Sequence, residues 1–155
     1  MARACGSVHG IVGHSMGGAA TGLAMAEGLC AKRVVLIAPG AEPRYFARQL
    51  AGWLGLSERA TDEMLRRVLQ RLGGAWVEYE IPNLVRAVRA PMLLIHDAQD
   101  TDVPWEHGRA IAAAWPGARL ETVHGLGHRR VLRDPDVTRR VLGFVSAGSS
   151  AHRAA

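Results

Sequence analysis

The sequence has little cysteine and no long apolar run. Cys5 and Cys30 are its only cysteines, and their separation fits neither a metal site nor a redox pair, so we expect two buried or free thiols. No run approaches the ~18 consecutive apolar residues that cross a bilayer. The first residues, Met1–Gly6, lack the apolar core of a secretory signal. We therefore expect a cytoplasmic protein that does not insert into a membrane.

Lysine is also scarce, because Lys32 is the only one and the net charge of +5 comes from arginine. The arginines are scattered, for example as pairs at 66–67, 129–130 and 139–140. Neither a glycine- and aromatic-rich RNA-binding pattern nor a zinc-finger spacing accompanies them. We interpret them as solvated surface charge and expect no nucleic-acid partner.

The composition is that of a folded domain. Of the 155 residues, 48% are hydrophobic and 21% are charged, which is typical of a globular protein with a core. A chain of this length is most simply one domain, which we place at residues 1–150. The small and polar residues 146–155 are expected to form a frayed tail.

Short apolar segments alternate with helical patterns along most of the chain. The expected strands are 8–12, 33–38, 92–96 and 120–123. The expected helices are 16–28, 105–115 and 135–145, the last opened by Asp134-Pro135. This alternation indicates an α/β fold with about four parallel strands. Successive crossovers in one direction place their helices on one face, so only the final helix should cover the other.

Residues 41–89 interrupt the alternation and are expected to form a short helical, cap-like insertion. Tyr45–Leu54 is predicted to be helical, and so are one or two turns within Asn83–Arg89. Between them, Thr61 is expected to cap a helix with one apolar face, formed by Leu65, Val68, Leu69 and Leu72. The insertion could cover a binding site or pack on the sheet. Its aromatic residues could accordingly line a pocket or belong to the core: Tyr45, Phe46, Trp53 and Trp76.

The sequence at 13–18, Gly-His-Ser-Met-Gly-Gly, follows the first expected strand and is typical of a nucleophile elbow. Such a turn lifts the hydroxyl of Ser15 above the sheet at the start of a helix. The helix dipole there favours developing negative charge, and the backbone N–H of Met16 is placed to donate to an oxyanion.

Glycines surround this serine on both sides. Larger residues at Gly13 and Gly17 are expected to clash in the tight turn. We also expect Gly17, Gly18 and Gly22 to let the helix pack closely against the first strand, because they remove side-chain bulk.

Carboxylates follow the third expected strand, and histidines follow the fourth. The acidic candidates are Asp97, Asp100 and Asp102, and the basic candidates are His124 and His128. Residues after parallel strands meet beyond their carboxyl ends, so these groups should lie at the same edge as Ser15. Histidine can take the serine proton, and a carboxylate can fix the imidazole tautomer. The order serine, aspartate, histidine predicts nucleophilic hydrolysis.

Three segments together resemble the C-terminal portion of the α/β-hydrolase superfamily, without its N-terminal strands. They are residues 13–18, His-Asp-Ala-Gln-Asp-Thr-Asp-Val-Pro at 96–104, and Gly-Leu-Gly-His at 125–128. The resemblance covers most of the chain and implies a truncated α/β-hydrolase fold, with residues 41–89 where the family has its variable cap. It implies Ser15 as nucleophile, Asp100 as acid and His128 as base, with no cofactor.

The competing residues receive other expected roles. Asp102 should cap or support the following helix, and Asp97 should end its strand. The pair His124 and His128 could suggest a metal, but the glycines between them argue against the helix that such a pair needs. His124 should be a strand-end residue. Packing or surface positions are expected for four further histidines: His9, His14, His96 and His107.

The resemblance also implies absent parts, because the family's sheet has about eight strands. A second oxyanion donor normally comes from a loop after an early strand, and its loss commonly costs about 10²–10³ in rate. The strand at 8–12 would be an exposed edge. We therefore expect a homo-oligomer, a two-fold dimer formed through that edge or through the exposed sheet face.

Two functions from different classes remain. The first is a serine esterase that cleaves small carboxylic esters through an acyl-enzyme on Ser15. The second is a non-catalytic or split-enzyme half that needs a partner chain to complete the sheet and the oxyanion hole. A truncated chain is a third interpretation, and residues 41–89 do not specify the acyl or alcohol group.

Overall fold

A computed structural model of the chain describes residues 8–147. The expectations for Met1–Gly6, for Cys5 and for the tail after Ala147 lie outside these residues. The strands are β1 (Val8–His14), β2 (Ala31–Ile37), β3 (Met92–Asp97) and β4 (Ala118–Val123). The α-helices are α1 (Met16–Ala26), α2 (Pro43–Trp53), α3 (Glu58–Leu72), α4 (Ile81–Leu84), α5 (Trp105–Ala114), α6 (Gly127–Arg130) and α7 (Pro135–Ser146). Short 3-10 turns are η2 (Trp76–Tyr79), η3 (Val85–Ala87) and η4 (Val131–Arg133).

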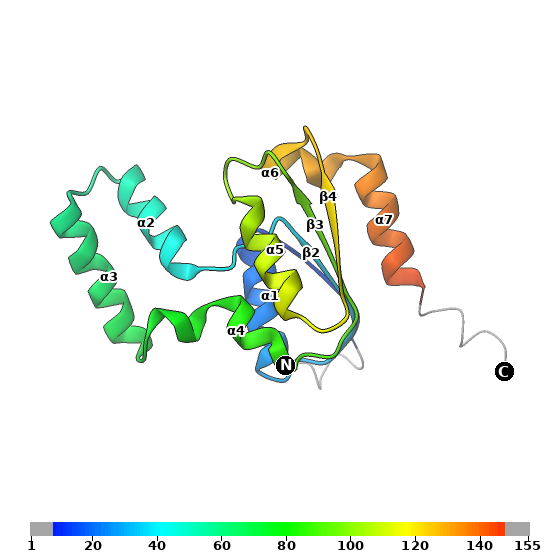
Figure 1. Ribbon diagram of the computed structural model, residues 1–155, viewed down its shortest axis with the longest axis horizontal. Coiled ribbons are helices and arrows are strands. Elements are labelled where there is room, and N and C mark those ends of the chain that lie inside the picture. The colour runs from blue at the N-terminus through cyan, green and yellow to red at the C-terminus, as the bar shows by residue number, and fades with distance from the viewer. Residues whose placement is uncertain (1–7, 148–155) are drawn as a thin grey trace.

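The four strands form one parallel sheet in the order β1-β2-β3-β4, which confirms the predicted α/β fold (Figure 1). Each strand is one or two residues longer than its pattern predicted, because ladder hydrogen bonds extend past the apolar run. β3 is buried along its whole length, from Met92 to Asp97. Central parallel strands are covered on both faces, which explains why β3 is apolar without alternation until its end.

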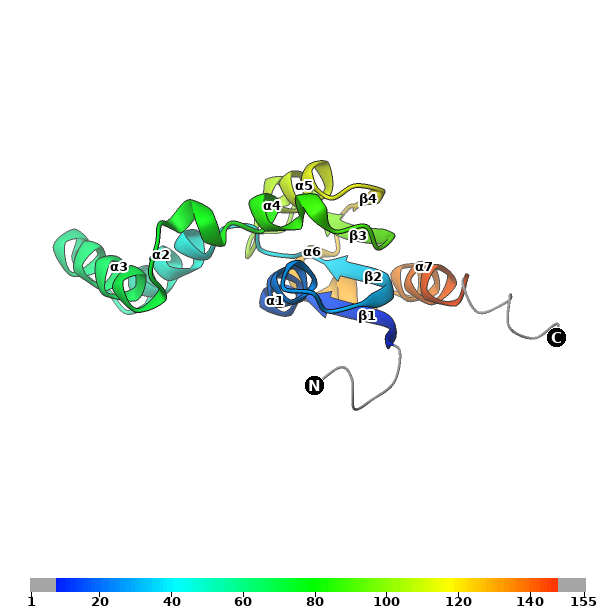
Figure 2. The same ribbon diagram turned by 90° about the horizontal axis from the view of Figure 1, so that it is seen from below.

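The two faces of the sheet are covered by different helices, as predicted. On one face, Val34, Leu36 and Leu94 pack with Ile111 of α5 and with Ile81 and Val85 of the insertion. On the other face, Val35, Ile37 and Leu93 pack with Val131 and with Val137 of α7. Figure 2 shows α1, α4 and α5 on one side of the sheet and α7 on the other. Alternating strand residues point to opposite faces, so neighbours in sequence belong to different core clusters.

The insertion divides into a part on the core and a part beside it. α4 and η3 pack against α1 and α5, and Ile81 and Val85 are buried there. The pair α2 and α3 extends sideways from the sheet and its helices pack on each other (Figure 1). The ends of this pair leave apolar side chains exposed, including Trp53 at 80% and Leu54 at 62%.

The predicted cap of α3 is wrong. Ser57, with extended backbone angles, precedes the helix, and its hydroxyl accepts from the N–H of Ala60. Thr61 lies inside the helix and is buried, and Leu65 from the predicted apolar face is buried beside it. Serine and threonine are both good caps, so the choice depends on where the chain leaves α2. At α7 the prediction is confirmed, because Asp134 caps the helix through the N–H groups of Asp136 and Val137.

Within residues 8–147, no helix is both long and apolar enough to cross a membrane.

Candidate active site

The turn between β1 and α1 has strained backbone geometry at its serine. Ser15 has φ 54° and ψ −122°, in the region that side chains disfavour. Its N–H donates to the carbonyl of Ile37 at 3.0 Å, and its carbonyl accepts from Gly18 and Ala19 at 3.0 and 3.2 Å. Strain of this kind costs on the order of 1–3 kcal/mol and persists only where the surroundings enforce it. These bonds tie the serine to β2 and to the first turn of α1.

The two glycines that flank the turn differ in what surrounds them. A Cβ on Gly13 would lie 2.7 Å from the Gly17 carbonyl oxygen and 2.9 Å from the Gly18 Cα. A Cβ on Gly17 would meet nothing within 4 Å, so the predicted clash at Gly17 is wrong. The predicted close approach to β1 holds at Gly18, whose added Cβ would lie 3.4 Å from the Gly13 carbonyl oxygen and 2.9 Å from Pro39. It is wrong for Gly22, whose added Cβ would meet Ile81 of the insertion and no atom of β1.

We expect Gly13→Ala to destabilise the fold and Gly17→Ala to be tolerated. The Gly13 methyl would press against backbone atoms that cannot move away, at a cost of roughly 1–3 kcal/mol. The Gly17 methyl points into open space, and alanine favours a helix over glycine by about 1 kcal/mol. Urea denaturation of the two variants measures the difference. Equal midpoints would contradict the close approach at Gly13.

Met16 follows the serine as the first residue of α1, and its residue surface is 80% exposed. Among the backbone hydrogen bonds that the described residues make outside the helices and strands, none uses the Met16 N–H as donor. The first N–H groups of a helix have no partner within it. The Met16 N–H is therefore available to an oxygen placed above Ser15.

Asp100 and His128 are brought together from two loops. The Oδ2 atom of Asp100 lies 2.8 Å from Nδ1 of His128. The Oδ1 atom accepts from the N–H groups of Asp102 and Val103, both at 2.9 Å. The Asp100 side chain is fully buried and that of His128 is 10% exposed. With Nδ1–H facing the carboxylate, Nε2 is the free basic nitrogen of the imidazole.

His14 connects the serine strand to the histidine loop. Its Nε2 lies 2.9 Å from the His128 carbonyl oxygen and donates to it, and the two rings lie 4.6 Å apart between centroids. The residue directly before Ser15 is thereby bonded to the backbone of His128. In the part of the chain that the structure describes, no hydrogen bond joins the Ser15 hydroxyl to the imidazole. Such bonds are often long before substrate binds.

His96 lies beside the carboxylate of Asp100. Its side chain is fully buried, and its Nε2 donates to the Val103 carbonyl at 3.0 Å and lies 3.5 Å from Oδ2 of Asp100. Its Nδ1 is the one buried polar side-chain atom without a partner among residues 8–147. A Cβ on Gly108 would lie 2.4 Å from this nitrogen, so the glycine leaves room for the ring.

We expect the free energy of unfolding to fall as the pH drops below about 6.5. Burial lowers the pKa of His14, His96 and His107, because it disfavours the imidazolium. The unfolded chain therefore binds more protons in acid than the folded one. Stability from these groups is present above the ordinary histidine pKa and is lost as the pH falls through the lowered values. Urea titrations from about pH 8 to pH 5 measure this, and a flat profile would contradict it.

The remaining acidic and basic candidates lie elsewhere. Asp102 does not cap α5, whose N-cap position is Pro104; its carboxylate lies 3.7 Å from Nε of Arg129. Asp97 ends β3 as predicted, and it also accepts hydrogen bonds from the loop before His128. His124 is exposed after β4. Within residues 8–147, no group of three or more histidine, cysteine or acidic side chains is arranged to hold a metal ion.

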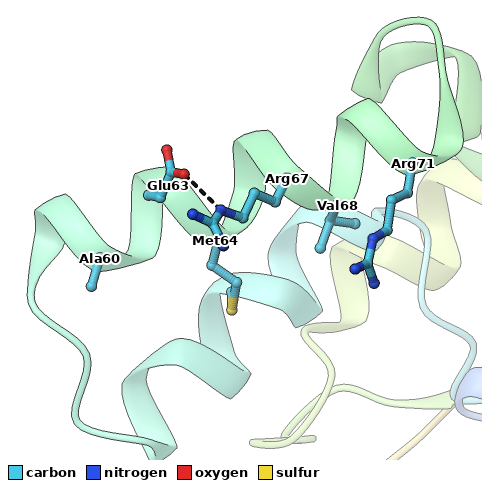
Figure 3. Close-up of a pocket in the computed structure, with 6 residues that line it drawn as sticks. All are labelled: Ala60, Glu63, Met64, Arg67, Val68 and Arg71. Carbon is cyan, nitrogen blue, oxygen red and sulfur yellow. Dashed lines mark hydrogen bonds and ion pairs between the residues drawn. The ribbon is translucent and has the colours of Figure 1, made fainter.

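The aromatic residues of the insertion differ in their surroundings. Tyr45 and Phe46 pack against the buried ring of His107, while Trp53 is largely exposed. A hollow of about 520 Å³ lies on one face of α3 and includes none of the three candidate residues (Figure 3). Its lining residues are Ala60, Glu63, Met64, Arg67, Val68 and Arg71. The hollow therefore does not indicate a substrate pocket.

The parallel sheet, the strained serine turn and the Asp100–His128 pair define the class of an α/β-hydrolase fold. The model of the alpha/beta hydrolase family matches residues 2–141, and the chain belongs to that family.

The chain covers only part of the length of each relative that it resembles. The chain is 32% identical over 88 residues to a protein of Pseudomonas savastanoi pv. phaseolicola named "Putative carbamate hydrolase RutD". The aligned residues make up 56% of this chain and 32% of that protein. It thus spans about a third of the length of this curated relative. Similar structures include a "Putative non-heme bromoperoxidase BpoC" from Mycobacterium tuberculosis H37Rv (19% identity, TM-score 0.64, 89% of this chain, 66% of that one). Another is an esterase domain from Rhodothermus marinus (23% identity, TM-score 0.59, 94% of this chain, 60% of that one).

Proposed function

We propose that this chain carries the catalytic centre of a serine hydrolase that cleaves small carboxylic esters. Ser15 is the nucleophile, His128 the base and Asp100 the acid. The observation that supports this most strongly is the 2.8 Å contact between Asp100 Oδ2 and His128 Nδ1, because it leaves Nε2 of the imidazole free to accept a proton. The strained turn at Ser15 is the second support.

The reaction follows from these groups. The Ser15 oxygen attacks the ester carbonyl carbon while its proton passes to Nε2 of His128, which becomes an imidazolium stabilised by Asp100. The Met16 N–H donates to the oxyanion of the tetrahedral intermediate. The imidazolium then protonates the leaving alcohol and an acyl-enzyme remains on Ser15. Water then attacks the acyl carbon while its proton passes to Nε2 of His128. The bond between the acyl carbon and the Ser15 oxygen breaks, the proton returns from His128 to that oxygen, and the acid is released.

Esters are the proposed substrate class because a solved structure of similar fold is named an esterase domain. The curated relative named a carbamate hydrolase points to a related carbonyl group. Both substrates are cleaved at a carbonyl carbon, and the proposed Ser15 chemistry applies to each.

Labelling with a fluorophosphonate probe tests the proposal, because the probe reacts with activated serines. We expect one phosphonylated peptide, the one that contains Ser15, in the folded chain and none after heat denaturation. Ser57, the N-cap of α3, is the internal control and should stay unmodified. Labelling that is absent from the folded chain, or found at Ser57 alone, would contradict the proposal.

A second candidate function is supported by the free edge of the sheet. Among the described residues β1 pairs with β2 alone, and Val12, whose register partner Val35 faces α7, is 53% exposed. Strand edges with apolar neighbours favour addition of another strand. We propose as the alternative that the chain is one half of a hydrolase and becomes active when a second copy pairs with β1.

Light scattering coupled to size-exclusion chromatography separates the two candidates. The alternative expects a dimer and a labelling rate that rises with chain concentration. A monomer that is labelled at a rate independent of concentration would contradict the alternative and leave the first proposal standing.

A further inference from the structure

We propose that Asp97 is a positioning residue for this chemistry: its carboxylate binds the backbone of the loop before His128 and so sets where the imidazole lies. The inference rests on the proposed function. Asp97 is the last residue of β3 and only 1% of its surface is exposed. A buried carboxylate must have its oxygens hydrogen-bonded, and its partners therefore report what it does.

Both oxygens of Asp97 accept from backbone N–H groups. Oδ2 accepts from Leu126 at 2.5 Å and from Gly127 at 3.0 Å, while Oδ1 accepts from Gln99 at 2.7 Å. Leu126 and Gly127 are the two residues directly before His128. The Asp97 carboxylate thus binds the backbone that follows β4, at the two residues before His128.

Gln99 extends the same interaction by one residue. Its Oε1 accepts from the N–H of Gly125 at 2.9 Å, so three consecutive N–H groups, at 125–127, are bound by the side chains of Asp97 and Gln99. Gly125 and Gly127 have φ 74° and 64°. Positive φ at alternate residues turns successive N–H groups toward one side, where they form a concave anion site. The glycines of the Gly-Leu-Gly segment therefore shape a site for a carboxylate.

The charge of Asp97 is retained in this site. Burial by itself would raise the pKa of Asp97, but the N–H groups of Gln99, Gly127 and Leu126, together with the nearby His124, hold that pKa below its ordinary value. From the outer side, Arg130 donates to the carbonyls of Leu126 and Gly125 at 3.0 and 2.9 Å. The loop is thus bound through its N–H groups on one side and its carbonyls on the other.

The segment from Asp97 to Asp100 therefore positions both the carboxylate of Asp100 and the loop that carries His128. The N–H of Asp100 donates to the Asp97 carbonyl at 3.2 Å, and Asp100 Oδ2 contacts Nδ1 of His128. A shift of the loop would move His128 relative to both Asp100 and Ser15. Misplacement of a catalytic group by about 1 Å can cost about 10²-fold in rate.

The test is Asp97→Asn, which keeps the shape and removes the charge. The amide has one acceptor oxygen, so its NH₂ group must face a backbone N–H that the carboxylate had bound. We expect kcat for p-nitrophenyl acetate to fall about 10- to 100-fold with KM changed less than about threefold. We also expect faster hydrogen exchange of the Leu126 and Gly127 amides, measured by NMR.

Asp134→Ala is the stability control. One Asp134 oxygen also accepts from two successive N–H groups, those of Asp136 and Val137, both at 2.9 Å. It caps α7 and binds no part of the loop before His128. We expect a loss of melting temperature in both variants, because alanine at position 134 removes the cap at a cost of about 1 kcal/mol, with kcat lowered only in Asp97→Asn. This split separates positioning from a general loss of stability.

The outcomes distinguish the two proposals. Suppose that the wild-type chain is active. If Asp97→Asn then keeps its kcat, or if the Asp97 and Asp134 variants lose kcat equally, the role of Asp97 is overturned and the serine mechanism stands. If the wild-type chain neither hydrolyses the ester nor reacts with the fluorophosphonate, the proposed function is overturned. Hydrogen exchange then decides the role of Asp97: unchanged protection at Leu126 and Gly127 overturns it.

Discussion

Ser15→Ala is expected to lower kcat/KM for p-nitrophenyl acetate by about 10⁴- to 10⁶-fold. Without the hydroxyl no acyl-enzyme can form, and the remaining groups, His128 and the Met16 N–H, can only assist direct attack by water. The variant should fold at least as well as the wild type, because alanine removes a polar group from a turn already enforced by the bonds of the Ser15 backbone. Steady-state kinetics together with circular dichroism measure both effects.

Ser57→Ala provides the control for that experiment. The Ser57 hydroxyl caps α3, far along the chain from the candidate site, and its removal should cost about 1 kcal/mol of stability without changing the rate. Equal rates in the wild type and in Ser15→Ala would reject Ser15 as the nucleophile. An equal loss in both serine variants would instead show that the assay reports stability.

Asp100→Asn is expected to lower kcat by about 10⁴-fold. The amide oxygen can still accept from the N–H groups of Asp102 and Val103, so the loop should keep its shape. The NH₂ group then faces Nδ1 of His128, which must become the acceptor. The proton moves to Nε2, and the imidazole can no longer take the proton of Ser15. Measuring kcat across a range of pH gives the size of the loss and shows whether the imidazole still acts as the base.

Asp102→Asn is the matched control for the acid. Asp102 is exposed, and its carboxylate contacts Arg129 only at 3.7 Å. Ion pairs of this kind contribute little, and we expect kcat within about twofold of the wild type. If Asp102→Asn lowers kcat more than Asp100→Asn does, the acid has been assigned to the wrong residue.

The strands were predictable because their signals are local. The apolar run at Val34–Ile37 fills both faces of the sheet, and its burial needs no information beyond its neighbours. The helix boundaries were harder to predict than the strands. Ser57 and Thr61 are both good caps, and the path of the chain out of α2 decides between them. The glycines show the same limit, since Gly13 is crowded by α1 whereas Gly17 faces open space.

The family, the parallel sheet and the candidates Ser15, Asp100 and His128 could be predicted from the sequence, because each depends on a motif or a period within a few residues. Which side chains meet depends on the tertiary structure. His14 reaches the His128 carbonyl across 114 positions, and Asp97 reaches Leu126 across 29. Such contacts depend on which strands lie side by side and on the φ angles of two glycines. No local pattern contains that information, and so a strand-end aspartate became a candidate for positioning the catalytic loop.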